Sequence, residues 1–202
     1  MHDETFDPAT LAFYANEAPV YAARGTDGAN RHLEAFLDRL TPGHRILELG
    51  CGGGKDAALM IKRCFDVDPT DGVPEIAAQA EARLDRPVRV MRFDELDAVE
   101  AYDAVWASAT LLHVPRAGLT AILTSIWRAL KPGGWHEASY KGGGADGRDR
   151  FDRYYNYLSR AQLEEHYEAA GPWTLMEIEE GMGGGYDGVQ GPWQSITVRK
   201  PL

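Results

Sequence analysis

"ILELGCGGGKD", residues 46–56, places a short apolar segment directly before four glycines within five positions. Residues 45–49 are typical of a short buried strand, and residues 55–64 are typical of the helix that follows it. Glycine has no Cβ, so the backbone can turn sharply there and pass close to a ligand. One glycine normally suffices for a tight turn. Four of them therefore favour a ligand that lies against this backbone.

Outward from this turn, apolar periodicity and turn residues predict alternating strands and helices. Residues 173–180 and 193–200 read as an antiparallel pair joined by a glycine-rich loop. The alternation indicates an α/β fold with a mostly parallel sheet and helices on both faces. The expected helices are 8–24 with a break at Pro19, 30–40 ending at "TPG", 55–64, 73–84, 119–130 closed by "KPGG", and 159–171; further strands are 87–93, 102–108 and 135–141.

Composition limits the partners of this chain. Its 202 residues predict a single domain, 1–202, and its net charge of −10 argues against a nucleic-acid partner, which needs clustered Lys and Arg. No apolar stretch reaches the length of a membrane span, and the acidic N-terminus is unlike a secretion signal. Cys51 and Cys64 lack metal-site spacing, and free thiols suit the cytoplasm. We expect a cytoplasmic protein without metal or membrane partner, either a monomer or a homodimer.

The glycine turn is similar to two nucleotide-binding motifs but matches neither completely. A phosphate-cradling loop needs Ser or Thr after its lysine, but Asp56 follows Lys55. The dinucleotide fingerprint needs glycine at position 55. An acid that accepts ribose hydroxyls belongs about twenty residues beyond such a turn, where Asp71 stands. Glu48 would repel a pyrophosphate and attract an ammonium or sulfonium group. We infer an adenosine ligand with a positively charged tail.

These residues give the sequence its resemblance to a known family. It resembles the class I S-adenosylmethionine-dependent methyltransferases, especially small bacterial proteins similar to tellurite-resistance and ubiquinone-biosynthesis methyltransferases. The resemblance implies a Rossmann-like, seven-stranded, mostly parallel sheet of order 3-2-1-4-5-7-6 with strand 7 antiparallel. It also implies S-adenosyl-L-methionine as the cofactor. The matching stretches, within residues 45–141, are "ILELGCGGGKD", "FDVDPTDGVPEI", "YDAVWASATLLHVP" and "IWRALKPGGW".

The resemblance also implies which residues bind the cofactor. The methionine part is expected at the glycine turn, the ribose at an acid after the second strand, and the adenine next to it. An acid after the third strand would reach the adenine amino group, and the end of the fourth strand would approach the sulfonium. In that order the residues are Glu48, Gly50, Cys51 and Gly52; Asp71; Gly72 and Ile76; Asp94 or Glu95; and Ala107 and Ser108.

Two further segments are candidates for covering the site. In relatives the N-terminal segment, here 1–42, folds as a helical cap over the cofactor. Arg24 would then pair with the methionine carboxylate and Tyr21 would wall the pocket, while Tyr14 is a candidate substrate contact. Residues 142–158 follow the fifth strand and read as a lid that excludes water. Arg153 and Tyr154 are its candidate substrate contacts. Core packing of the tyrosines and a plain surface connection at 142–158 remain the alternatives.

His113, just beyond the fourth strand, is the candidate general base, with packing in its loop as the alternative. His136 and Glu137 fall in an expected buried strand and need polar partners there. "ASAT" at 107–110 lacks the Asn-Pro-Pro-aromatic sequence used on planar amino groups, which favours a small-molecule acceptor. The preferred hypothesis is therefore an S-adenosylmethionine-dependent methyltransferase. A non-catalytic cofactor-binding protein, an NAD(P)-dependent oxidoreductase and a protein methyltransferase are the alternatives.

Overall fold

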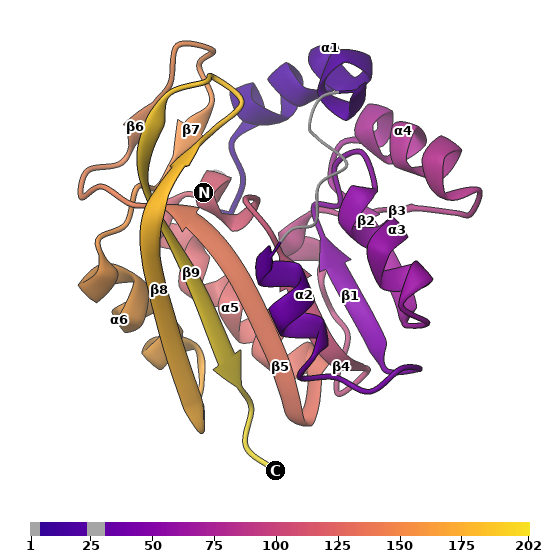
Figure 1. The fold of residues 1–202 in the computed structure, drawn as a ribbon. Coiled ribbons are helices and arrows are strands. Elements are labelled where there is room, and N and C mark those ends of the chain that lie inside the picture. Colours follow the sequence, from indigo (N-terminus) through magenta and orange to yellow (C-terminus); the bar gives the residue numbers. More distant parts are fainter. Residues whose placement is uncertain (1–4, 24–30) are drawn as a thin grey trace.

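The computed structural model describes residues 5–23 and 31–202 (Figure 1). Strands and helices alternate through most of the chain, and two strands end it. The helices are α1 (Pro8–Ala23), α2 (Arg31–Leu37), α3 (Lys55–Lys62), α4 (Pro74–Leu84), α5 (Arg116–Ala129) and α6 (Arg160–Ala170), with 3₁₀ turns η1 (Phe93–Glu95) and η2 (Leu111–His113). The strands are β1 (Arg45–Leu49), β2 (Asp66–Asp71), β3 (Arg89–Val90), β4 (Tyr102–Ala107), β5 (Leu130–Lys141), β6 (Gly147–Arg148), β7 (Tyr154–Tyr155), β8 (Leu175–Gly184) and β9 (Gln190–Arg199).

Seven strands form one sheet of order β3-β2-β1-β4-β5-β9-β8, and β6 pairs with β7 separately. The first five strands of that order run parallel, and β9 runs antiparallel to both β5 and β8. Since β8 and β9 are the sixth and seventh strands of the sheet along the chain, the expected order 3-2-1-4-5-7-6 is confirmed. The antiparallel pair expected near the C-terminus is confirmed as well.

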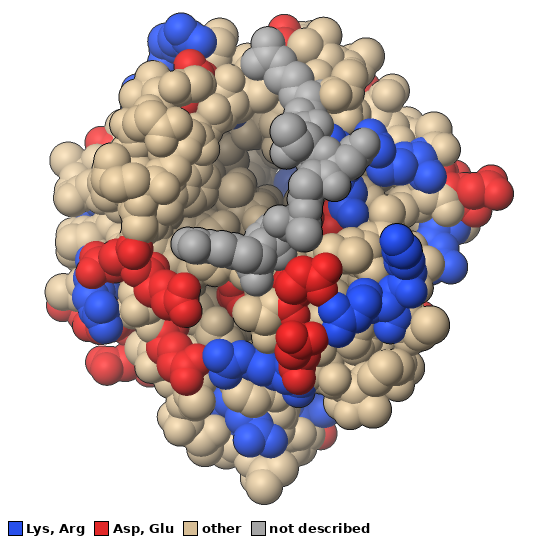
Figure 2. Space-filling model, viewed as in Figure 1, with Lys and Arg blue, Asp and Glu red and all other residues tan. Residues whose placement is uncertain are grey.

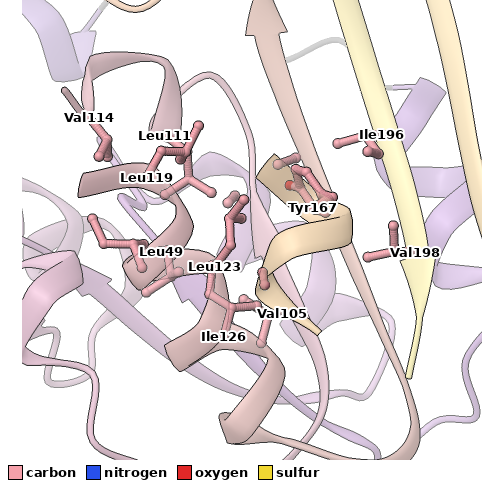
Figure 3. Packing of buried hydrophobic residues seen from close by; sticks show 14 of the residues in the cluster. Leu49, Val105, Leu111, Val114, Leu119, Leu123, Ile126, Tyr167, Ile196 and Val198 are labelled. Atoms are coloured by element: carbon pink, nitrogen blue, oxygen red, sulfur yellow. The ribbon is translucent and has the colours of Figure 1, made fainter. Parts of the chain in front are cut away.

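The central strands are buried on both faces, as parallel sheets require. Along β1, Ile46 packs toward α2 and α3, whereas Leu47 and Leu49 pack toward α5 and the C-terminal strands. Figure 3 shows the second of these clusters, where α5 presents Leu119, Leu123 and Ile126 to the sheet. The alternation of side chains along β1 thus leaves Glu48 on the face of Ile46, one residue before the strand ends.

α1 crosses above the carboxyl ends of the central strands (Figure 1). The break expected at Pro19 is wrong, because α1 is continuous from Pro8 to Ala23. Pro19 lies on the exposed side of this helix, while Ala18 packs with Val73 and Ile76 of the α4 region. Tertiary packing against α4 therefore holds the helix together through a residue that lacks a backbone N–H.

Two strand boundaries also differ from expectation. The third strand contains only Arg89 and Val90, because the Glu95 carboxylate accepts the Arg92 backbone N–H at 2.7 Å and the chain turns into η1. The helix expected to close at "KPGG" ends at Ala129, and "KPGG" itself lies at the start of β5. The pairing of β4 with β5 changes register there, because Tyr102 pairs with Leu130 whereas Ala104 pairs with Trp135. Gly133, within the extra residues of β5, has a φ of +76°. The extra residues form an irregular strand that glycine allows.

His136 and Glu137 have structural partners inside the sheet. His136 is fully buried between the Val105 carbonyl, 3.0 Å from Nδ1, and the Tyr167 hydroxyl, 2.9 Å from Nε2. Thr197 Oγ1 donates to Glu137 Oε2 at 3.2 Å. Burial raises the pKa of Glu137 to about 8. Both polar side chains are therefore satisfied within the core, in agreement with the structural interpretation.

Among the described residues, no helix has the length and apolar character needed to cross a membrane. Within the same residues, no group of three or more His, Cys, Asp or Glu side chains is arranged to hold a metal ion.

The raised pKa of Glu137 predicts a pH-dependent stability. Between pH 4.5 and about 8 the unfolded chain has released the Glu137 proton while the folded protein keeps it, so ionisation favours unfolding. We expect the free energy of unfolding of the wild type, relative to Glu137→Gln, to fall across this window by an amount on the order of 3 kcal/mol. Urea denaturation at a series of pH values measures it. Glu168→Gln, at an exposed residue of α6, is the control. If the difference in free energy of unfolding between the wild type and Glu137→Gln did not change with pH, the burial of an acid at position 137 would be contradicted.

Candidate functional site

Two adjoining pockets lie beyond the carboxyl ends of the central strands. The first runs from the glycine turn after β1, past the end of β2, to α1 and η1. The second, of about 460 Å³, lies between α1, the end of β5, the β6–β7 segment and the β8–β9 loop. Figure 2 shows that this face is hollowed, with one side of the hollow formed by residues that are neither acidic nor basic. Open parallel sheets bind ligands at this edge.

The glycine turn is built without side chains for steric reasons. Gly50, Gly52 and Gly54 have φ values of +67°, +54° and +76°, in the left-handed region that favours glycine. A Cβ on Gly50 would lie 2.0 Å from Thr110 Oγ1, so Thr110, three residues after the end of β4, leaves no room for one. The Cys51 N–H donates to the Thr70 carbonyl at 2.8 Å, which ties the turn to β2.

Asp71, at the end of β2, holds the turn from the other side. Its Oδ2 accepts the Gly52 N–H at 3.1 Å, and its Oδ1 accepts the Val73 N–H at 2.9 Å. Burial raises the Asp71 pKa to about 6, although the two N–H groups oppose the shift. Each carboxylate oxygen retains a further lone pair. Asp71 lines the first pocket and can accept hydrogen bonds from a ligand.

Glu48 lies behind the turn, beside a third hollow that it lines together with Lys55 and Asp56. The side chain is buried, and Oε2 has no hydrogen-bond partner among the described residues. Burial, together with the charges of Asp56 and Asp71, raises the Glu48 pKa well above its ordinary value. A buried carboxyl oxygen without a partner is costly. A cationic ligand group beside the glycine turn would satisfy it.

Four residues line both main pockets: Tyr14, Tyr21, Ala109 and His113. His113 Nδ1 lies 2.6 Å from the Tyr154 carbonyl oxygen, which can only accept, so Nδ1 carries the proton. Nε2 then accepts from the Tyr14 hydroxyl at 2.9 Å, and Arg153 Nη1 donates to that hydroxyl oxygen at 2.9 Å. Burial lowers the His113 pKa to about 4, so the imidazole in this wall is neutral at pH 7.

Comparison with known proteins agrees with this geometry. Residues 46–134, from β1 to the start of β5, match the family described as "Methyltransferase domain". This part of the chain is therefore similar to a methyltransferase domain. Among curated relatives, the ubiquinone biosynthesis O-methyltransferase of Xanthomonas oryzae pv. oryzae is 32% identical over 148 residues. The alignment covers 63% of this chain and 61% of the relative, so the chain spans about three fifths of that protein's length.

Solved structures share the fold of this chain. The Burkholderia thailandensis 1,6-didemethyltoxoflavin-N1-methyltransferase, solved with its substrate and S-adenosylhomocysteine, is 19% identical with a TM-score of 0.75, covering 96% of this chain and 88% of that one. The [4+2]-cyclase SpnF has a TM-score of 0.71 at 19% identity, and the match covers 98% of both chains. At these identities the likeness is one of fold.

The domain brings most of the expected site residues together. Arg24 lies outside the described residues. The first pocket is lined by Tyr14, Tyr21, Gly50, Gly52, Asp71, Gly72, Ile76, Ser108 and His113; the hollow beside it by Glu48 and Cys51; and the second pocket by Arg153.

Four expected residues line none of these pockets. Asp94 pairs with Arg92 and accepts from Thr5, and Glu95 caps η1, so both carboxylates serve the loop after β3. Ala107 is fully buried under α5. The Tyr154 hydroxyl donates to Asp146 at 3.0 Å, on the outer side of the β6–β7 segment.

Sequence reasoning missed several lining residues. Arg92 and Phe93 take the place beside the first pocket that was expected for Asp94. Thr110 stands three residues after the end of β4, and its position beyond a central strand was the one available signal. Lys141, Tyr186 and Trp193 of the second pocket come from strand ends and a loop far apart in the sequence. No local pattern marks them, because only the sheet order brings β5 next to β9.

The contact between Gly50 and Thr110 predicts a context-dependent cost. Gly50→Ala should lower the free energy of unfolding by about 1–2 kcal/mol for the left-handed backbone and about 1–3 kcal/mol for the clash. In a Thr110→Gly background the clash is removed, so only the backbone cost should remain. Urea denaturation of the two single variants and the double variant measures the difference. An equal cost of Gly50→Ala in both backgrounds would show that Thr110 does not crowd the turn.

Proposed function

We propose that this chain transfers a methyl group from S-adenosyl-L-methionine to a small-molecule acceptor and releases S-adenosylhomocysteine. The observation that carries the proposal is the wall shared by the two pockets. Methyl transfer from a sulfonium is an in-line displacement, so donor and acceptor must face each other through one opening. Tyr14, Tyr21, Ala109 and His113 line both pockets, so the two pockets adjoin at these residues, where the proposal places the opening.

The residues of the first pocket suit the cofactor. In this proposal Asp71 accepts the ribose hydroxyls with its free lone pairs, and Gly72 and Ile76 lie beside the adenine. The partnerless oxygen of Glu48 receives the ammonium group at the glycine turn, where Gly50 and Gly52 allow close approach. Bound there, the cofactor supplies an activated methyl group. The protein then contributes alignment and the exclusion of water.

His113 is proposed as a member of the transfer machinery, and base catalysis by its imidazole stays a prediction. Its contacts favour a further role. Nε2 and Arg153 together fix the Tyr14 hydroxyl, which lines both pockets. A pKa of about 4 makes the imidazole a weak base at pH 7, so positioning of Tyr14 is the larger contribution that we expect from it.

The setting of the enzyme is also part of the proposal. The net charge of −10 supports a protein without a nucleic-acid partner, and two free cysteines, Cys51 and Cys64, support the cytoplasm. We propose a monomer or homodimer. α1 and residues 142–158 are proposed to act as a cap and a lid, since both contribute lining residues.

Titration calorimetry with S-adenosylhomocysteine, together with transfer of radiolabelled methyl groups to a panel of small acceptors, tests the proposal. We expect heat of binding and labelled product. A protein that gives no heat at millimolar ligand does not hold this cofactor, which would reject the proposal. Binding without product across the panel would identify a non-catalytic binding protein, whereas binding of NADH instead would identify the oxidoreductase.

Glu48 predicts a proton release on binding. Burial and the charges of Asp56 and Asp71 raise its pKa in the free protein, which favours the protonated form; an adjacent ammonium group favours the ionised form. Binding of S-adenosylhomocysteine at pH 7 should therefore release a proton and tighten as pH rises. Calorimetry in buffers of different ionisation enthalpy measures the release.

In Glu48→Gln the release should be lost and affinity should fall about tenfold. Glu81→Gln, exposed on α4, is the matched control and should keep both. Proton release that persists in Glu48→Gln would assign it to another group and remove Glu48 from the ammonium site.

A further inference from the structure

The second pocket has an aromatic wall of its own. Beyond the residues that it shares with the first pocket, it is lined by Tyr155 of β7, Tyr186 of the β8–β9 loop and Trp193 of β9. Aromatic side chains offer large flat surfaces with little conformational entropy to lose. A flat ring is the ligand shape that such walls bind best.

Lys141, the last residue of β5, brings a positive charge to this aromatic pocket. Its ammonium lies 4.5 Å from the centre of the Tyr155 ring and 6.0 Å from that of Trp193, and the side chain is only 10% exposed. The Asp187 carboxylate is 3.5 Å away, at the long limit of a hydrogen bond. An ammonium has three N–H donors. Contacts with the described residues leave Lys141 with donating capacity toward the pocket.

Arg153 adds a second cation to the pocket. The carboxylate paired with it, that of Asp149, does not line the pocket. The Arg153 guanidinium binds Asp149 through Nε and Nη2 and Tyr14 through Nη1. Neither Asp149 nor Asp187 lines the pocket, and no Asp or Glu is among the described residues that do. Of the two ion pairs, Lys141 with Asp187 and Arg153 with Asp149, only the cations line the pocket. In a site of low dielectric this arrangement favours an anion.

From these contacts we infer that the second pocket takes a small aromatic acceptor that carries an anionic group, with its ring against the aromatic wall and its charge near Lys141. This inference rests on the proposed function, because it names the class of molecule that receives the methyl group. It agrees with the wall chemistry: the His113 nitrogens are both engaged, by Tyr14 and by the Tyr154 carbonyl. An acceptor that arrives with a negative charge relies less on a strong base.

Matched probes test the charge preference directly. The probes are aromatic carboxylic acids and their primary amides, from benzoate and benzamide to 2-naphthoate and 2-naphthamide. Each acid and its amide share shape and differ in charge. Binding to the full chain is measured by ligand-observed NMR titration, with and without saturating S-adenosylhomocysteine. We expect the acids to bind about tenfold more tightly than their amides.

Variants of Lys141 identify the residue responsible. Lys141→Gln should remove the preference for the acids, and Lys141→Arg, which keeps the charge, should retain it. Lys62→Gln, exposed on α3, is the matched control and should behave as the wild type. Thermal melting of each variant verifies that the fold is kept; if Lys141→Gln does not fold, the comparison of acids with amides on the wild type still decides whether the pocket prefers an anion.

Three results would overturn the inference: amides that bind as well as acids, neither class binding at millimolar concentration, or a preference that is unchanged in Lys141→Gln. The parallel titration with S-adenosylhomocysteine separates this outcome from failure of the proposed function. A protein that binds the nucleoside and shows no preference for the acids keeps the function and loses the anionic acceptor. A protein that prefers the acids but does not bind the nucleoside keeps the anion-binding pocket and loses the proposed function.

Discussion

The carboxyl group of Asp71 is the contact on which this site depends. One oxygen accepts the Gly52 N–H of the turn after β1, and the other accepts the Val73 N–H at the start of α4. A single side chain at the end of β2 therefore fixes two turns relative to each other. The turn can be held so closely only because Gly50 has no Cβ to meet Thr110. The first pocket is the space that these constraints leave open.

Charge is distributed unevenly across the wall between the two pockets. The acids Glu48, Asp56 and Asp71 lie around the glycine turn together with the cations Lys55 and Arg92, whereas the charged residues among the described lining of the second pocket are the cations Lys141 and Arg153. Such a pattern suits a cationic donor on one side and an anionic acceptor on the other. Both partners would then be attracted into place before the reaction. In the proposed methyl transfer, the cationic donor and the anionic acceptor would react from two separate pockets.

The wall itself joins segments that are remote in sequence. Tyr14 comes from α1, His113 from η2 and Arg153 from the segment before β7, and hydrogen bonds link the three. Arg153 is 1% exposed although it carries a full charge, because Asp149 and Tyr14 satisfy it. This buried network couples the helix above the site to the segment beside it. Loss of any member leaves a buried polar group without its partner.

Local patterns predicted the elements well where they agreed with packing and failed where packing overruled them. The glycine turn, the helix expected over 159–171 and the C-terminal antiparallel pair are all present at the expected places. Pro19 was read as a break because it lacks an N–H, but the contact of α1 with α4 keeps the helix whole. Asp94 was expected near the adenine because of the family resemblance, and that role stays a prediction. In the structure Asp94 pairs with Arg92 and accepts from Thr5, contacts that the resemblance does not reveal.

The sequence by itself determined the α/β fold, the sheet order implied by its resemblance, and the turn with Glu48 and Asp71 on either side. The alternation of strands and helices and the glycine turn with its two acids are local features, since they depend on glycine freedom, strand length and the position of an acid after a strand. The sheet order came from the resemblance alone. Only the tertiary structure decided the second pocket. Lys141, Tyr186 and Trp193 become neighbours because β9 inserts antiparallel between β5 and β8, and a contact made by sheet pairing has no signature in the residues that form it.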